Sequence, residues 1–192
     1  MEVTMLSKRV IYLLFCLVLC VGLIQCDDDN DNNDDDNNLP PDGNAVGNHA
    51  LDFTLKDQNN NDVSLYDYDG KIVLIDFSAM WCGPCQAEAA KAEALYQKYR
   101  GQGLQVLTVL IANVANQPCT QADLQTWANT YGLTFPVLND VSRVAWNLYN
   151  TEGYIPLNIV MDQKLVIQYK DVGYDETAIV STIENLIANP AD

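Results

Sequence analysis

The sequence predicts one α/β domain in which helices flank a central mixed sheet. Two almost wholly apolar runs, Ile72–Phe77 and Leu104–Ala112, are typical of strands buried on both faces of a sheet, and the helix-prone stretch 84–100 lies between them. Strands joined through a helix in this way run parallel. Further on, residues 157–161 and 164–171 alternate like an antiparallel hairpin turned at Asp162-Gln163, and this hairpin makes the sheet mixed.

The domain is expected to span residues 45–189 and to begin with a β-hairpin. Residues 51–55 and 62–65 have the pattern of short strands, and the residues between them are rich in Asn and Asp, as in a turn. His49, the only histidine, precedes this hairpin. We expect it to be a surface residue where a strand begins.

Helices are predicted from the spacing of their apolar residues. The helix over 84–100 has small residues on one side, which would let it lie close to the sheet. They are Ala87, Ala90, Ala94 and Leu95. A capping box, Thr120–Asp123, opens a second helix, and a short extended piece, 135–138, precedes a third. The expected core residues of the last three helices are Leu124, Trp127, Ala128 and Tyr131, then Val141, Val144, Ala145 and Leu148, and finally Ile179, Ile183, Leu186 and Ile187.

Two cysteines with two residues between them, Cys82 and Cys85, carry the predicted chemistry. They follow a buried strand at the point where the first helix begins. Unpaired N–H groups and the helix dipole favour an anion there, so they lower the pKa of the first thiol, and the thiolate is the reactive form. Gly83 permits a tight turn, and Pro84 has no N–H to lose in the first turn. We expect Cys82 to be the nucleophile and Cys85 to resolve the mixed disulfide.

A cysteine pair at this spacing also occurs in zinc sites, which usually need four ligands. Beyond the pair and the cysteines of the N-terminal segment 1–26, the sequence offers only Cys119 and His49 as further Cys or His ligands. We therefore expect a redox dithiol that needs neither a metal nor another cofactor.

Three features resemble the thioredoxin superfamily, and more closely its TlpA/ResA-like membrane-anchored extracytoplasmic thiol-disulfide oxidoreductases, which have a redoxin (AhpC/TSA-like) domain. They are the motif Trp81–Cys85, Asp76 six residues before the first cysteine, and Ile155-Pro156 ahead of a late strand. The resemblance spans roughly residues 46–187. It implies a thioredoxin-like fold with an N-terminal β-hairpin and a helical insertion before the late proline.

The resemblance also implies roles for single residues. Asp76 would lie buried under the dithiol and help to move protons, and Pro156 would have a cis peptide bond and face the cysteines. Such a cis bond occurs in about 5–6% of X-Pro bonds, so nothing but the resemblance predicts it. The residues expected to contact the substrate are Trp81, Gly83, Pro84, Ile155 and Pro156.

The implied function is reduction of disulfides in extracytoplasmic client proteins, apocytochrome c being the family's best-known client. A Gly-Pro pair between the cysteines resembles reducing members, although an oxidase role stays open. Electrons would come from a membrane donor of the DsbD/CcdA type, and the chain would act as a monomer.

Two other functions fit parts of the sequence. Peroxiredoxins share this fold and the Asp-Phe-Thr-Leu start at Asp52, but their peroxide-binding Pro and Thr/Ser positions hold Ile75 and Ala79 here. Copper chaperones of the Sco type have three residues between their cysteines and a histidine well downstream. This chain has two residues there and no such histidine.

Residues 1–25 have the pattern of a signal peptide. Two basic residues precede the apolar run Val10–Ile24, which is shorter than the roughly 20 residues of a spanning helix. The run ends in a sequence that resembles a bacterial lipobox, with Cys26 as the lipidated residue. Gln25 departs from the small residue usual there, so an uncleaved anchor is the alternative. Either one would place the domain outside the cytoplasm, in the periplasm or at the cell surface, attached to a membrane.

Residues 26–44 are predicted to form a disordered tether. From Asp27 to Asn38 every residue is Asp or Asn, so the tract cannot bury apolar surface and its charges repel. The glycine and terminal glutamate of a calcium loop are missing. With a net charge of -16 and no basic cluster, binding to nucleic acid is not expected.

Cys119 has no role in the predicted dithiol chemistry or in the membrane attachment. It is interpreted as a partly buried surface cysteine, but other readings stay open. It could form a regulatory disulfide or pair between chains, and its place just before a helix N-cap could lower its pKa.

Overall fold

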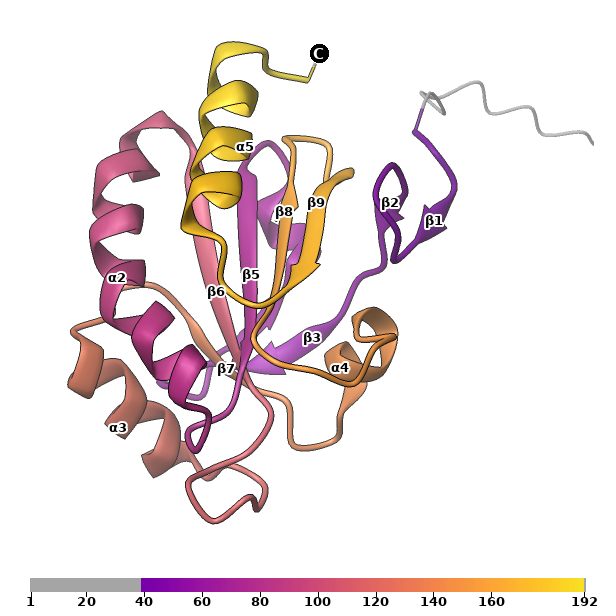
Figure 1. Ribbon diagram of the computed structural model, residues 1–192. Helices are drawn as coiled ribbons and strands as arrows, with labels where there is room; N and C mark the ends of the chain where they lie inside the picture. Colours follow the sequence, from indigo (N-terminus) through magenta and orange to yellow (C-terminus); the bar gives the residue numbers. More distant parts are fainter. Residues whose placement is uncertain (1–38, 192) are drawn as a thin grey trace, which may run out of the picture. The chain divides into compact units, whose positions relative to one another are not determined.

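The computed structural model describes residues 39–191, so the predicted signal peptide, Cys26 and most of the tether lie outside the described residues. A seven-stranded sheet has the order β4-β3-β7-β6-β5-β8-β9 (Figure 1). Its strands are β3 (Thr54–Lys56), β4 (Asp62–Ser64), β5 (Ile72–Ser78), β6 (Leu104–Leu110), β7 (Val137–Asn139), β8 (Leu157–Met161) and β9 (Ile167–Val172). A separate parallel pair consists of β1 (Asp42–Gly43) and β2 (His49–Ala50). None of the helices within residues 39–191 combines the length and the apolar character that crossing a membrane requires.

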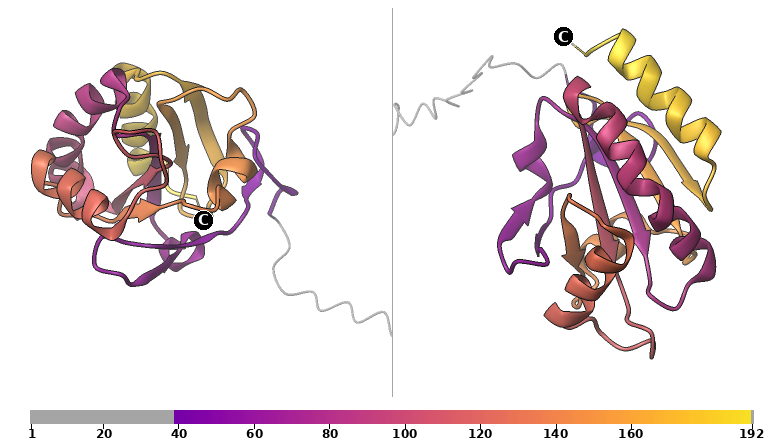
Figure 2. Two further views of the ribbon diagram at one scale, coloured as in Figure 1. Left: turned by 90° about the horizontal axis from the view of Figure 1, so that it is seen from below. Right: turned by 90° about the vertical axis from the view of Figure 1, so that its left-hand side faces the viewer.

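The helices are α2 (Gly83–Tyr99), α3 (Gln121–Tyr131), α4 (Val144–Tyr149) and α5 (Glu176–Ala188), with short 3₁₀ turns η1 (Leu65–Tyr68) and η2 (Arg100–Gln102). Two hydrophobic cores lie on the two faces of the sheet. Helices α2, α3 and α5 cover one face, and α4, η1 and the segment before β3 cover the other (Figures 1 and 2). Every residue of β5 is buried, because this strand is central and covered on both faces.

The mixed sheet is confirmed. β5 pairs in parallel with β6 and antiparallel with β8, and β8 pairs antiparallel with β9. The N-terminal hairpin forms between β3 and β4, and its first strand begins at Thr54, later than the predicted residue 51. The short extended piece becomes β7, and the capping box at Thr120 forms as expected, with Asp123 completing it.

The predicted buried face of α2 is wrong. Ala87, Ala90 and Ala94 are exposed. The helix instead buries a set that follows from Cys85 at i, i+3, i+4 and i+7, because a cysteine at the first turn fixes the rotation of the helix. This set is Cys85, Glu88, Ala89 and Ala92.

Two other expectations need correction. Val141 lies before α4 and is exposed, and Val144 is exposed as well, because α4 turns Ala145 and Tyr149 toward the core. The turn between β8 and β9 extends beyond the two residues predicted, and β9 begins at Ile167.

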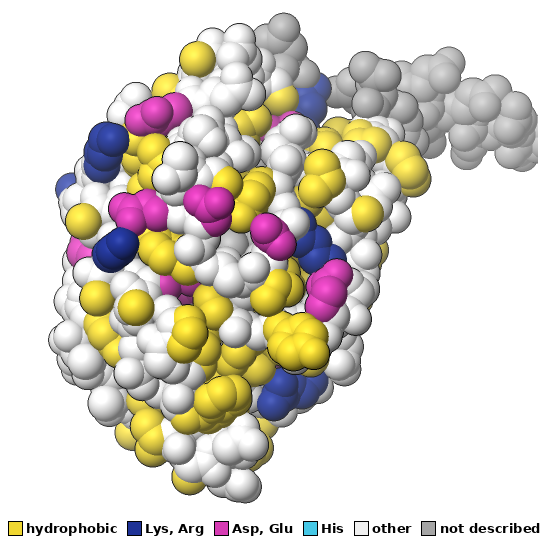
Figure 3. Space-filling model, viewed as in Figure 1, with side chains coloured by type: hydrophobic (Ala, Val, Ile, Leu, Met, Phe, Trp, Pro, Cys, Tyr) yellow, Lys and Arg dark blue, Asp and Glu magenta, His cyan; other side chains and the backbone are white. Residues whose placement is uncertain are grey.

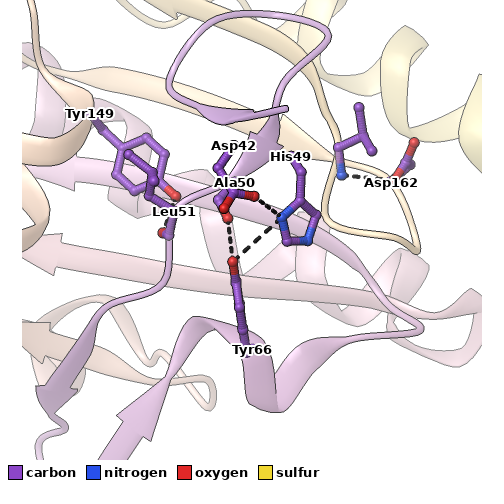
Figure 4. A network of polar contacts seen from close by, with 8 residues as sticks. Asp42, His49, Ala50, Leu51, Tyr66, Tyr149 and Asp162 are labelled. Carbon is purple, nitrogen blue, oxygen red and sulfur yellow. Dashed lines mark hydrogen bonds and ion pairs between the residues drawn. The ribbon is translucent and has the colours of Figure 1, made fainter. Parts of the chain in front are cut away.

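The folded domain begins earlier than residue 45, so the predicted end of the tether at residue 44 lies inside it. Asp42 Oδ1 lies 2.8 Å from Nδ1 of His49. The Tyr66 hydroxyl donates a hydrogen bond to the carbonyl oxygen of Ala50 (2.9 Å), and the Tyr149 hydroxyl donates to that of Leu51 (Figure 4). These contacts hold the segment around β1 and β2 against the domain.

Candidate active site

The two cysteines form a disulfide at the start of α2. Cys82 is the N-cap of the helix, and its Sγ accepts the amide N–H of Cys85 at 3.3 Å. Pro84 lies in the first turn, as predicted from its missing N–H. The strand-to-helix junction is therefore confirmed, and the sulfur of Cys82 occupies the position that favours negative charge.

Between and beside the two cysteines, the motif residues Trp81, Gly83 and Pro84 are exposed. Cys82 is 4% exposed and Cys85 is fully buried, whereas Trp81 is half exposed. The indole N–H of Trp81 donates to Asn116 Oδ1 at 3.0 Å, in the loop after β6. An aromatic face next to the first sulfur is a surface that a polypeptide substrate can contact.

A row of buried polar side chains crosses three adjacent strands on the α2 side of the sheet. Asp76 of β5 lies directly opposite Thr108 of β6 and Asn158 of β8. Ser78 Oγ donates to one carboxyl oxygen of Asp76 (2.6 Å), and Thr108 Oγ1 donates to the other (3.4 Å). Burial nevertheless raises the pKa of Asp76 above its usual range, against the effect of these two hydrogen bonds.

Glu88 is the buried acidic residue that sequence reasoning missed. It follows Cys85 by three residues on the same buried face of α2, and Asn158 Nδ2 donates to its Oε2 at 3.2 Å. Burial, and then the nearby charge of Asp76, raise the pKa of Glu88 strongly. The two carboxyl groups therefore favour holding a proton near neutral pH, and Glu88 lies one turn of helix from Cys85.

The Ile155-Pro156 peptide bond is cis, as the resemblance implied. Pro156 is buried, and its carbonyl oxygen accepts the amide N–H of Gly173 at 2.7 Å. Because β8 runs antiparallel to β5, its beginning lies at the end of β5 from which the cysteine motif follows. The proline and the dithiol thus share one end of the sheet.

Among the alternatives left open for Cys119, a lowered pKa is contradicted. The thiol is 5% exposed and unpaired with any other described cysteine. Burial, and then the charge of Asp123, raise its pKa to about 12. A thiol of this kind is inert at neutral pH.

No cluster of three or more His, Cys, Asp or Glu side chains that could hold a metal ion occurs in residues 39–191. On the face shown in Figure 3, basic and acidic side chains are interspersed, without a continuous basic surface.

The structure combines a disulfide that caps a helix, a mixed sheet and a cis-proline directly before β8. Together these features define a thioredoxin-like protein of the thiol-disulfide oxidoreductase class. The chain belongs to the AhpC/TSA family, whose family model matches residues 46–170.

Characterised relatives agree with this class. The chain is 36% identical over 127 residues to the thioredoxin-like protein YneN of Bacillus subtilis, covering 66% of this chain and 71% of that protein. It is 34% identical over 119 residues to the thiol-disulfide oxidoreductase ResA of Geobacillus kaustophilus, covering 62% of this chain and 64% of ResA, a little under two thirds of its length.

Solved structures show the same fold. The exposed lipoprotein thioredoxin of Streptococcus pneumoniae is 27% identical, with a TM-score of 0.60, and the match covers 71% of this chain and 100% of that one. The thioredoxin domain of a thiol-disulfide oxidoreductase from Bacteroides vulgatus is 23% identical, with a TM-score of 0.63, and the match covers 74% of this chain and 98% of that one.

Proposed function

We propose that this chain reduces disulfide bonds of extracytoplasmic client proteins through the Cys82-Cys85 dithiol. The observation that carries the proposal is the disulfide at the start of α2, with Cys82 as its N-cap. Substrate contacts are assigned to the exposed Trp81 with Gly83 and Pro84, and to the Ile155-Pro156 loop.

The exchange proceeds in two steps. The Cys82 thiolate attacks one sulfur of the client disulfide, so that a mixed disulfide forms and the other client sulfur leaves as a thiolate that takes up a proton. The Cys85 thiol then loses its proton and attacks Sγ of Cys82. The Cys82-Cys85 disulfide forms, the second client thiol is released, and two electrons have passed to the client.

The proton of Cys85 needs an acceptor inside the protein, because Cys85 is fully buried. We assign this role to the carboxyl pair of Asp76 and Glu88. Burial raises the pKa of both carboxyl groups toward the ordinary range of a thiol, which suits proton transfer between Cys85 and the pair near neutral pH.

The proposed place of action is outside the cytoplasm, with Cys26 as the lipid attachment site or the apolar run before it as an anchor. The exposed lipoprotein thioredoxin of Streptococcus pneumoniae supports this placement. A membrane donor of the DsbD/CcdA type would return electrons to the dithiol, and the chain would act as a monomer. Apocytochrome c is the first client to test.

The decisive experiment is the reduction potential of the Cys82-Cys85 couple in a Cys119→Ser background, equilibrated in dithiothreitol or glutathione buffers. A reductant should have a value near the roughly -270 mV of thioredoxin, and a value near the roughly -120 mV of DsbA would reverse the proposed direction of electron flow.

A further inference from the structure

One edge of the seven-stranded sheet is only partly covered. β9 is the outer strand on that side. The chain before β3 pairs with its beginning, because Gly47 donates to the carbonyl oxygen of Ile167 (2.8 Å) and the Ile167 amide donates to that of Asn48 (2.9 Å). Within residues 39–191, no strand continues this pairing along the rest of β9 (Figure 1).

The register of β8 and β9 shows which backbone groups are open. Gly173 donates to the carbonyl oxygen of Pro156, so these opposite residues form a hydrogen-bonded pair. Such pairs alternate along an antiparallel ladder, and Val172 and Lys170 therefore direct their N–H and C=O groups away from β8. The Val172 amide donates to Asp171 Oδ1 (2.8 Å), whereas the backbone N–H and C=O of Lys170 have no partner among the described residues.

An open groove of about 480 Å³ lies along this edge. Its lining includes Val46 and Tyr154, which are 59% and 68% exposed, and Val172, which is 36% exposed. Leu157, which directly follows the cis-proline, also lines it. The groove is therefore continuous with the end of the sheet that carries the proposed active site.

Charge distinguishes between possible occupants. Lys170 is the one cation in the lining, and its ammonium already donates to the carbonyl oxygen of Asn44 (2.9 Å). Glu152 and Asp171 add negative charge. The Asp-rich residues 27–36 of this chain are thus a poor match for the groove, whereas an apolar, neutral or basic extended segment fits both its walls and its open backbone groups.

We propose that the outer edge of β9 from Lys170 to Val172 binds an extended apolar segment of a disulfide-bonded client as an added strand, with side chains of that segment against Val46 and Tyr154. The inference rests on the proposed function, since it assigns where the client polypeptide lies while its disulfide reaches Cys82. It makes the enzyme selective for clients whose cystine is flanked by flexible chain.

The matched variants Lys170→Pro and Lys170→Ala test this in the full-length chain. Both substitutions remove the ammonium group, but only proline also removes the backbone N–H of residue 170. Because that N–H points away from β8, no hydrogen bond to β8 is lost. Each variant is assayed for kcat/KM with insulin, a protein disulfide, and with hydroxyethyl disulfide, which is too small to form a strand. Lys170→Pro should lose about tenfold with insulin relative to Lys170→Ala. The two should match within about twofold with hydroxyethyl disulfide.

The outcomes separate the two proposals. If the two variants reduce insulin equally, or if Lys170→Pro loses activity equally on both substrates, strand addition at β9 is overturned. The proposed function would stand in either case. Failure of the wild-type chain to reduce either substrate would overturn the proposed function, and with it this inference.

A second measurement does not depend on the proline variant folding. The insulin B chain is trapped on the Cys85→Ser variant as a mixed disulfide, and amide hydrogen exchange is compared with the free variant. The Lys170 amide should exchange at least about tenfold more slowly in the complex, while amides of the opposite edge strand β4 are unchanged. Unchanged exchange at Lys170 would count against the added strand.

Discussion

Two cysteines lie at the start of two helices, yet their surroundings are opposite. Cys82 is itself the N-cap of α2, and its sulfur accepts the amide N–H of Cys85. Cys119 lies one residue before the N-cap of α3, where Thr120 and Asp123 make the capping contacts. Burial and the Asp123 charge raise the pKa of Cys119 to about 12. The helix N-terminus near Cys119 therefore does not offset the effect of burial, since Thr120 and not the sulfur takes the capping position.

The largest expected effect comes from removing the sulfur at the first of these helix starts. Serine is a good N-cap, so Cys82→Ser should keep α2 intact while lowering the rate of insulin reduction by dithiothreitol to the uncatalysed background. Cys85→Ser should instead accumulate mixed disulfides with clients, visible on non-reducing gels. Activity of Cys82→Ser equal to that of the wild-type chain would show that the roles of the two cysteines are assigned wrongly.

The contrast between the thiols can be measured directly by alkylation. A pKa of about 12 leaves only about one Cys119 thiolate in 10⁴ at pH 8. In the reduced, folded chain, iodoacetamide should label Cys82 in minutes and leave Cys119 unlabelled, as followed by mass spectrometry. Unfolding in urea should make Cys119 reactive, which controls for reagent access.

Carboxyl groups lie near both sites, but only those beside Cys85 are buried as a pair. Asp76→Asn and Glu88→Gln should each slow disulfide exchange at pH 7 by about 10²-fold, and the double variant should lose little more if the two act together. Stopped-flow rates across pH 5–9 check this. An unchanged pH profile in both single variants would remove the pair from the mechanism.

The same pair predicts the pH dependence of stability. Burial raises both pKa values in the folded state, which therefore binds more protons than the unfolded chain above about pH 4. Stability should fall as pH rises from there through the raised pKa values, by at most about 1.4 kcal/mol per pH unit and proton. Urea unfolding at pH 5 and pH 8 should show a smaller fall for Glu88→Gln than for the wild-type chain.

The smallest effect is expected at the second helix start. Thr120→Ala removes the side-chain cap of α3 and should cost about 1 kcal/mol of unfolding free energy without changing the insulin reduction rate. Chemical denaturation and the activity assay are run on the same preparation. A loss of activity larger than the loss of folded protein would link α3 to the dithiol.

Some of the fold could be predicted because its signals are local. The capping box at Thr120 and the Pro84 turn follow from backbone hydrogen bonding alone, and two apolar runs identify the central strands. Glu88 could not be found in this way, because glutamate is usually a surface residue and a run of alanines gives no preferred side to a helix. Its burial becomes visible only when the helix rotation is set from Cys85.

The open edge of β9 was equally out of reach from the sequence. Which positions of β9 stay uncovered depends on where residues 47 and 48 stop pairing with Ile167. Contacts between segments so far apart in the chain produce no periodic pattern in the sequence.

The polar row formed by Thr108, Asp76 and Asn158 also has a consequence for folding specificity. If β6 slipped by one residue against β5, Asp76 would face an apolar residue and lose the hydrogen bond from Thr108, and a slip of β8 would turn Asn158 away from Glu88. A buried carboxyl group that loses a hydrogen bond is costly, so misaligned sheets are destabilised more than they would be with apolar residues at these positions. The polar row that includes Asp76, one of the two carboxyl groups proposed to handle protons, thereby also favours a single alignment of the three central strands.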